Sequence, residues 1–544
     1  KSIRKREKVI IAKMEKLAWL VFLILYLQVN SLPVDSEDDI LPYLRGMGWR
    51  NVEKELMKDL RLDATVRPIS YEINLNISVK GYGGAYRSTF DGFVSIALNT
   101  SEPKDAIEVH SVRLNIKKAE FILASTVVEI SKIEYNRERE TVIFTLPKIL
   151  KPNDSATLKV YYNGTTLMRG VGLFEYWTKP EKKTESGLPT ISLATSSEPT
   201  GARMWFPCFD EPDKKATLRL RLTHPSELTA YSNTAGETKE IEHGMNETSF
   251  RTTVPLPTYA VAFAITAQPV AEIERKGKKI RAIGRDRVQL VNELPASMDF
   301  VMSQPVFENV TFFPEKTDWL VAEDYSGALE NPGLIVSYTI GHSKSTQIHE
   351  MAHMYFGNLV TLRSWEQIWI NEGFASFIQS GGNSMAQSSD ILSTISAHEP
   401  AIHQKFTYAN SQFLAEMFFG NGHIHYGKAG QFISFMKKFI GEDKFERALN
   451  RYLIDNSFGN GDSEMIINYF SSEVPEAREI MNDFVYQAGI PLLSVAEDNE
   501  KVIIKQRRFL RTDFLEELRD TRSRWTIPIY YEIDGVEHMK IMPR

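Results

Sequence analysis

Cysteine is almost absent from this sequence, in which Cys208 is the only one among 544 residues. A single cysteine excludes any disulfide within the chain. A lone cysteine is usually a small buried apolar residue rather than a catalytic one, and we expect that role for Cys208. The cysteine count leaves open whether the protein works in an oxidising compartment.

An excess of positive charge is also missing. The sequence holds 64 lysines and arginines against 70 acidic residues, which gives a formal net charge of -6. This balance excludes a broad basic surface, so we expect no nucleic-acid partner. The composition, 42% hydrophobic, is that of a globular protein, and the length fits about three or four domains. No feature of the sequence indicates an oligomeric state.

An apolar run near the N-terminus, residues 17–29, is broken only by Gln28. A membrane-spanning helix needs about 20 apolar residues, whereas a secretory signal needs roughly 7–15. We therefore expect residues 1–31 to hold a signal peptide with some upstream residues, and the protein to be secreted. The alternative is that the run anchors the protein at the membrane as a single span, with the preceding basic residues on the cytoplasmic side.

Acceptor sequences for N-linked glycans give mild support for secretion and predict a glycoprotein. Six sequons begin at Asn76, Asn99, Asn153, Asn163, Asn246 and Asn309.

The apolar pattern predicts an α+β multidomain protein that opens with strands. Residues 32–63 show no core pattern before Leu60 and are interpreted as a lead-in. From 64 to 268, stretches such as 71–79 and 216–222 alternate apolar and polar residues. This rhythm, with turns such as Asn163–Gly164, predicts an N-terminal antiparallel β domain.

Helical periodicity replaces this alternation in the second half of the chain. Residues 269–490 are predicted to form a mainly helical domain, with helices at 430–439, 444–454 and 463–470. Strand patterns return from 491 to 544. We expect them to begin a small β-sandwich domain that is incomplete at residue 544.

Histidine is scarce, with 11 in the chain, yet two of them stand in the pattern H-E-x-x-H. On a helix His349 and His353 project from one face and can reach one metal ion. Glu372, which opens an apolar-periodic run, is the candidate third ligand, because two histidines and one carboxylate hold catalytic zinc with a fourth position left for water. On its own, H-E-x-x-H also fits a core helix whose two histidines are hydrogen-bonded.

A zinc hydrolase also needs a base and an oxyanion donor. Glu350 is the expected base, because its neighbours on the helix already supply the two imidazole ligands and zinc-bound water is acidic enough to lose its proton near neutral pH. A tetrahedral intermediate further requires a donor outside the metal ligands, typically a phenol or an imidazole.

Three further segments, together with H-E-x-x-H and its downstream glutamate, resemble the zinc aminopeptidases of the aminopeptidase N family. Residues 327–331, G-A-L-E-N, are similar to the family's G-x-M-E-N motif. Residues 198–212, E-P-T-G-A-R-M-W-F-P-C-F-D-E-P, resemble its N-terminal-domain signature, and I-H-Y-G-K-A-G at 424–430 resembles the segment with its catalytic tyrosine. The resemblance runs in family order from about residue 61 to the end of the sequence.

The resemblance implies a thermolysin-like catalytic domain, one zinc ion and peptide substrates with a free N-terminus. It implies that zinc is bound by His349, His353 and Glu372. Glu350 would then be the general base and Tyr426 the oxyanion donor.

The same resemblance implies how substrate is held. Glu330 and Glu198 would bind the α-ammonium group, and the neighbouring substrate-binding residues would be Gly327, Ala328 and Asn331. Taken alone, Glu198 before a proline is more typical of a surface or turn carboxylate, and Tyr426 of an amphipathic core position.

The sequence also departs from the family pattern. Leu329 stands where the family usually has methionine, which could reshape the first substrate pocket. Relatives complete the β-sandwich and usually add a large helical domain. The alternatives to an aminopeptidase are a zinc endopeptidase, against which Glu330 and Glu198 count, and a catalytically impaired binding protein.

Overall fold

The computed structural model describes residues 60–80, 87–168, 170–178, 190–323, 327–337, 343–382, 402, 422–498, 501–509 and 523–544. All of these belong to one compact unit. The predicted signal peptide or anchor and the lead-in up to residue 59 lie outside the described residues. The described ranges contain no helix with the length and hydropathy that a membrane crossing needs.

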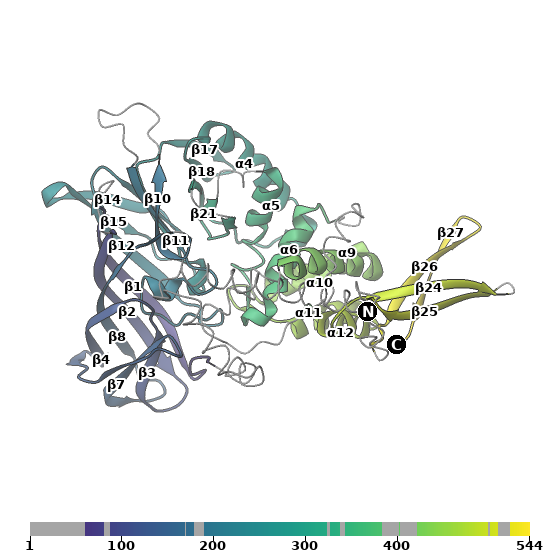
Figure 1. Ribbon diagram of the computed structural model, residues 1–544, viewed down its shortest axis with the longest axis horizontal. Coiled ribbons are helices and arrows are strands. Elements are labelled where there is room, and N and C mark those ends of the chain that lie inside the picture. Colours follow the sequence, from purple (N-terminus) through teal and green to yellow (C-terminus); the bar gives the residue numbers. More distant parts are fainter. Residues whose placement is uncertain are drawn as a thin grey trace, which may run out of the picture. The chain divides into compact units, whose positions relative to one another are not determined.

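The N-terminal part is built on an eight-stranded sheet (Figure 1). Its strands, in spatial order, are β14 (Gly236–Ile241), β15 (Met245–Phe250), β12 (Thr217–Pro225), β1 (Val66–Ser78), β2 (Thr89–Thr100), β8 (Ala156–Thr165), β4 (Asn115–Leu123) and β5 (Thr126–Glu129). Buried and exposed residues alternate along β1 as the sequence pattern predicts, because successive side chains of a strand point to opposite faces.

Two details of the sheet differ from the predictions. Most pairs are antiparallel, but β1 and β12 pair in parallel, so the domain is not purely antiparallel. Asn163 and Gly164 form no turn, since both lie inside β8. A Cβ atom on Gly164 would lie 2.4 Å from Cζ of Phe90 on the neighbouring strand, so this glycine provides room for an aromatic ring rather than a change of direction.

Two smaller sheets complete the β-rich part. One runs β13 (Thr229–Ser232), β16 (Phe263–Thr266), β11 (Thr190–Ser196), β10 (Gly172–Thr178) and β9 (Leu167–Met168). The other runs β3 (Lys104–His110), β7 (Thr141–Leu150) and β6 (Ile133–Asn136). Their inward faces form one apolar core that includes Leu62. Cys208 also lies in this core, which confirms the buried role expected for it.

Glu211 is a buried carboxylate beside this core. Its Oε1 atom accepts a hydrogen bond of 2.6 Å from the backbone N–H of Leu62. Burial raises the pKa of Glu211 from 4.5 to about 7, with the Leu62 hydrogen bond opposing the shift. Between these two pH values the folded protein therefore binds more protons than the unfolded chain, and its stability falls as pH rises.

We expect Glu211→Gln to remove this pH dependence, because glutamine keeps the acceptor atom and carries no charge. At each pH we subtract the free energy of unfolding of the wild type from that of the variant. This difference should increase by about 3 kcal/mol from pH 4.5 to pH 7. Unfolding measured across this range tests the expectation, with Glu72→Gln on the exposed face of β1 as control. A constant difference between variant and wild type would contradict it.

The second half of the chain carries its own sheet and most of the helices. The sheet runs β17 (Val270–Arg275), β18 (Lys278–Ile283), β19 (Lys316–Val321), β21 (Leu334–Ser337) and β20 (Ala328–Leu329). The α-helices among the described residues are α4 (Arg287–Met302), α5 (Lys344–Ala352), α6 (Ile368–Gln379), α9 (Ala429–Ile440), α10 (Glu442–Asp455), α11 (Ser463–Glu473) and α12 (Ala477–Tyr486).

Helix α4 packs on β17 and β18, and α5 packs between α4 and α6 (Figure 1). Local sequence explains several helix ends: Ser343 caps α5, Asp462 caps α11, and Gly441, with φ of 88°, separates α9 from α10. The predicted helices at 430–439, 444–454 and 463–470 are thus confirmed as α9, α10 and α11. A continuous apolar core joins this sheet to the helices.

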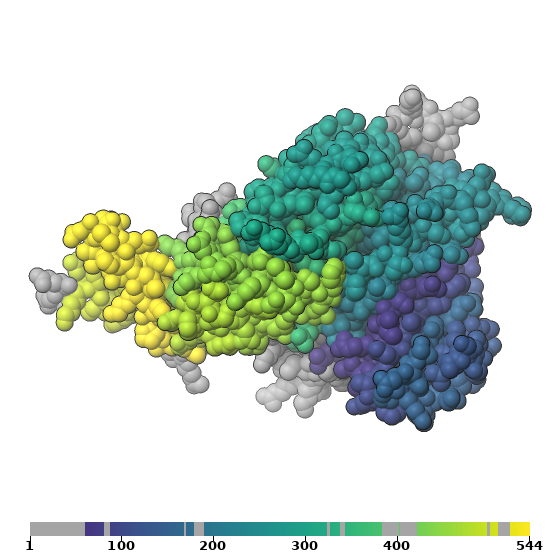
Figure 2. Space-filling view, turned by 180° about the vertical axis from the view of Figure 1, so that it is seen from behind, coloured from purple at the N-terminus to yellow at the C-terminus, as the bar shows by residue number. Residues whose placement is uncertain are grey.

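Two hairpins follow the helices, formed by β24 (Pro491–Asp498) with β25 (Lys501–Arg508) and by β26 (Ile527–Ile533) with β27 (Val536–Met542). In Figure 2 the yellow C-terminal residues lie against the yellow-green residues that precede them in the chain. Lys438 of α9 forms a 2.9 Å ion pair with Glu537 of β27. A β-rich N-terminal domain, a mainly helical region and later small sheets confirm the predicted fold class.

Candidate active site

The H-E-x-x-H segment lies at the end of helix α5. Ser343 Oγ accepts the N–H of Thr346 at 3.1 Å and so fixes where the helix begins. His349 and Glu350 are buried in the last turns, and His353 is the residue that ends the helix. The spacing of four places both imidazoles on one face, with ring centroids 4.7 Å apart.

Helix α6 brings Glu372 to the same place. Its Oε2 atom lies 3.2 Å from His349 Nε2 and 3.4 Å from His353 Nε2. The other ring nitrogens have partners of their own: His349 Nδ1 is 2.9 Å from Gln379 Oε1, and His353 Nδ1 is 3.0 Å from the carbonyl oxygen of Phe356. These oxygens accept Nδ1–H bonds, so both Nε2 lone pairs face Glu372.

This set of three atoms fits a metal ion. Two imidazole lone pairs directed at a carboxylate oxygen would repel it unless a cation lay among them. Tetrahedral zinc, with ligand bonds near 2.0–2.2 Å, separates its ligand atoms by about 3.3 Å. The distances of 3.2 and 3.4 Å in this cluster match that separation.

Glu350 lies beside the cluster but contributes none of its three candidate ligand atoms. Its carboxylate is within 4.8 Å of ligand atoms of Glu330 and His353. Burial raises the pKa of Glu350 well above its usual range, in spite of the opposing effect of His353. A buried carboxylate with a raised pKa is a stronger base than one in water.

Two further carboxylates, Glu198 and Glu330, lie next to Glu372 with oxygen atoms within 4.8 Å of one another. Burial and the neighbouring charge of Glu330 raise the pKa of Glu198 well above its usual range. One oxygen of each residue, Oε1, is buried and accepts no hydrogen bond from the described part of the chain. No lysine or arginine of that part forms an ion pair with any of the three. The geometry therefore favours a cation between them.

Tyr426 lies in a short π-helix, η7 (His423–Lys428), next to α9. Its ring stacks on that of His349 at 5.6 Å between centroids, with 21° between the planes. Burial, together with the negative field of Glu372, raises the pKa of Tyr426 well above its usual range. The phenol therefore remains protonated and is able to donate a hydrogen bond.

The G-A-L-E-N segment contains strand β20, which forms one edge of the sheet that runs β17, β18, β19, β21 and β20. Gly327 is exposed with φ of 96°, and Ala328 begins β20, which pairs only with β21 among the described strands. Glu330 and Asn331 are buried directly after the strand. Asn331 Nδ2 is buried and has no hydrogen-bond partner in the described ranges, so the segment holds a second unsatisfied polar group next to Glu330 in the sequence.

The observed contacts bring together seven of the ten residues predicted from the sequence: Glu198, Glu330, His349, Glu350, His353, Glu372 and Tyr426. Gly327, Ala328 and Asn331 are placed only as chain neighbours of Glu330. Two residues that were not predicted, Gln379 and Tyr259, lie beside these groups. Gln379 accepts a hydrogen bond from His349 and lies seven positions after Glu372 on α6. This spacing places Gln379 on the same helix face as Glu372, so the sequence could have indicated it. Tyr259 could not be found in this way. Its hydroxyl donates to the carbonyl of Gly357 at 3.1 Å and accepts from Nδ2 of Asn371 at 3.2 Å, across 112 positions of sequence.

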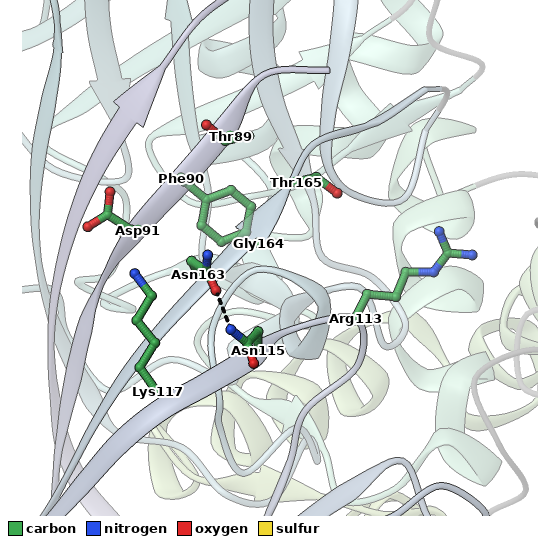
Figure 3. Close-up of a pocket in the computed structure, with 9 residues that line it drawn as sticks. All are labelled: Thr89, Phe90, Asp91, Arg113, Asn115, Lys117, Asn163, Gly164 and Thr165. Atoms are coloured by element: carbon green, nitrogen blue, oxygen red, sulfur yellow. Dashed lines mark hydrogen bonds between the residues drawn. The ribbon is translucent and has the colours of Figure 1, made fainter. Parts of the chain in front are cut away.

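A separate cavity of about 400 Å³ lies on the β domain, between β2, β4 and β8 (Figure 3). Its polar lining includes Asp91, Lys117 and the pair Asn115 and Asn163, in which Asn115 Nδ2 donates to Asn163 Oδ1 at 3.0 Å. His349, His353 and Glu372 do not line this cavity. The chemistry described above therefore belongs to the cluster and not to this cavity.

A β domain followed by a helical domain, with H-E-x-x-H on one helix and a glutamate on the next, is the arrangement typical of metallopeptidases of the two-histidine, one-glutamate class. The chain belongs to peptidase family M1. The family's N-terminal domain matches residues 67–260, and the Peptidase family M1 domain matches residues 303–485.

Similar proteins cover most of this chain. Aminopeptidase N of Haemonchus contortus is 26% identical over an alignment of 535 positions, gaps included, that covers 89% of this chain and 54% of the relative. For glutamyl aminopeptidase of Homo sapiens the identity is 27% over 565 positions, covering 93% of this chain and 55% of the relative. For alanine/arginine aminopeptidase of Saccharomyces cerevisiae it is 26% over 501 positions, covering 85% and 56%. The chain spans about half the length of the curated relatives it matches.

Proposed function

We propose that this protein is a zinc-dependent aminopeptidase that removes the N-terminal residue from peptides. The observation that carries the proposal is the pair Glu198 and Glu330, whose buried, unsatisfied oxygens lie beside the cluster of His349, His353 and Glu372. A pair of buried carboxylates accepts an ammonium group and leaves a capped N-terminus without compensation. Only the first peptide bond then reaches the reactive centre.

Each site residue has a separate role in the proposed reaction. His349, His353 and Glu372 would hold the zinc ion, which would supply an acidified water and a Lewis acid for the scissile carbonyl. Glu350 takes the proton from the attacking water and returns it to the leaving amine. Tyr426 donates its hydroxyl proton in a hydrogen bond to the oxygen that becomes negatively charged.

The edge strand supports a peptide as substrate. One side of the β20 backbone has no strand partner among the described residues, and Ala328 lies two residues before Glu330. An extended peptide can pair with such an edge through its main chain, which makes binding independent of its sequence. Pairing there would direct the substrate along the strand towards the carboxylates.

The test is a panel of aminoacyl-anilides with N-terminal Ala, Arg, Glu and Leu, each compared with its N-acetylated form. The first three residues are chosen because the relatives' names mention alanine, arginine and glutamate. We expect one zinc ion per chain by elemental analysis and hydrolysis of the free-amine substrates alone. Cleavage of acetylated peptides would instead support an endopeptidase, and zinc-free, inactive protein would support a binding function.

We further propose that the protein is secreted or bound to the outside of a membrane and that it is glycosylated. The proposal rests on the apolar run at residues 17–29 and on the six sequons, of which those at Asn153 and Asn309 lie on exposed residues with positive φ. Such turns leave the amide accessible to a modifying enzyme.

A further inference from the structure

The two carboxylates proposed to bind the substrate amine come from different parts of the fold. Glu198 follows strand β11 of the β-rich part, whereas Glu330 follows β20 of the second sheet. Two charged carboxylates repel each other, so in the charged form that would bind an ammonium group they do not fix their own separation. The scaffold between them must do so, because binding strength depends on how well a site is fixed before the ligand arrives.

The segment after Glu330 is a tight turn. The N–H of Leu334 donates to the carbonyl of Asn331 at 3.0 Å, and Gly333 has φ of 79°. The side chain of Asn233, from the β-rich part, contacts this turn. Its Nδ2 atom donates to the carbonyl of Pro332 at 2.9 Å.

Asn233 also bonds to the segment that holds Glu198. Nδ2 donates to the carbonyl of Ala260 at 2.9 Å, and Oδ1 accepts the N–H of Ala262 at 2.9 Å. Between these two residues, the carbonyl of Val261 accepts a hydrogen bond of 2.9 Å from Oγ of Ser197, the residue before Glu198. Hydrogen bonds and short backbone segments therefore connect the backbone near Glu330 to the backbone near Glu198.

The contact between Asn233 and the turn is also sterically close. A Cβ atom on Gly333 would lie 1.9 Å from the carbonyl oxygen of Asn233, so only glycine fits there. Nζ of Lys316 donates to the carbonyl of Gly333 at 2.7 Å and also to that of Ser232, next to Asn233. Asn233 itself is buried, with 6% of its surface exposed. The turn cannot shift without breaking these contacts.

We propose that Asn233 is a positioning residue for the amine site: it fixes Glu330 against Glu198 and so sets the affinity for the substrate's N-terminal ammonium. The proposal deepens the proposed function and rests on it. Asn233 touches neither substrate nor metal, and its effect reaches the site through Pro332 on one side and through Val261 and Ser197 on the other.

The test compares two ligands that differ only in the amine. Leucine hydroxamate and 4-methylpentanehydroxamate share the metal-binding group and the side chain, so the ratio of their dissociation constants reports the amine site alone. In the zinc-loaded wild type we expect leucine hydroxamate to bind at least about 30-fold more tightly. Asn233→Ala should reduce this ratio about tenfold, with binding of the amine-free ligand nearly unchanged.

Asn460→Ala is the matched control. Nδ2 of Asn460 also bridges two carbonyls, those of Pro212 at 3.0 Å and Leu362 at 3.2 Å, and so joins the same two parts of the fold without bonding to the Pro332 turn or to residues 260–262. We expect this variant to keep the wild-type ratio. A general loosening of the structure would lower the ratio in both variants and would overturn the proposal.

Asn233→Asp provides a second variant in case Asn233→Ala does not fold. It keeps the shape of the side chain and the acceptor for the N–H of Ala262, and replaces the amide that donates to Ala260 and Pro332. We expect a reduced ratio here too, and a wild-type ratio would refute the positioning role. A ratio near one in the wild type would instead refute the proposed function itself.

Discussion

Glu350→Gln is expected to bind zinc as the wild type does and to lose about a thousandfold or more in kcat on aminoacyl-anilides. Glutamine fills the same volume, so the three predicted ligands keep their positions. It cannot accept a proton, however. The raised pKa of Glu350, which burial causes, is the property that suits this side chain to take a proton from water and later release it.

The measurement pairs turnover with elemental analysis of the purified variant. Glu211→Gln is the matched control, since it is the same substitution at a buried glutamate of the β-rich part, and we expect it to keep normal turnover. Near-normal kcat in Glu350→Gln would refute the role of Glu350 as base. Loss of zinc together with activity would show that Glu350 helps to hold the metal.

The parts of the fold that depend on local periodicity were predictable. Alternation of apolar and polar residues indicated strands such as β1 and β12, because each strand has one buried face. The same alternation says nothing about which strands are neighbours. The parallel pairing of β1 with β12 was therefore missed, since the two strands are separated by more than a hundred residues of sequence.

The candidate site shows the same division. The spacing of His349 and His353 places them on one helix face whatever the rest of the fold does. Tyr259 and Asn233 carry no such signal, because they act through hydrogen bonds to groups far away in the sequence, such as the carbonyls of Gly357 and Pro332. No periodic pattern of the chain marks positions of this kind.

Glu330 was found only through the resemblance of its G-A-L-E-N segment to a family motif. Physically, its role depends on Glu198, whose carboxylate reaches the same place from another sheet. The nearness of these two groups is a property of tertiary structure, which no spacing rule contains. The structure also supplies the link through Asn233, which turns two repelling carboxylates into one fixed site.

Glu330→Ala is expected to abolish the preference for a free N-terminus. In the wild type, the ammonium group would lie against two buried carboxylates, and removing one partner of such a pair costs roughly 2–5 kcal/mol. We therefore expect kcat/KM on free-amine substrates to fall about a hundredfold or more. Activity on the acetylated forms, already low, should not fall with it, because those substrates never used the carboxylate.

Glu330→Gln separates charge from shape in the same experiment. Glutamine preserves the size of the side chain and one acceptor oxygen, whereas the negative charge is lost. We expect a loss close to that of Glu330→Ala, because an ammonium group is held by charge more than by a single neutral acceptor. If both variants kept the wild-type ratio between free and acetylated substrates, Glu330 would have no part in binding the amine. The choice of the substrate's end would then have to come from another feature of the site, such as the edge strand β20.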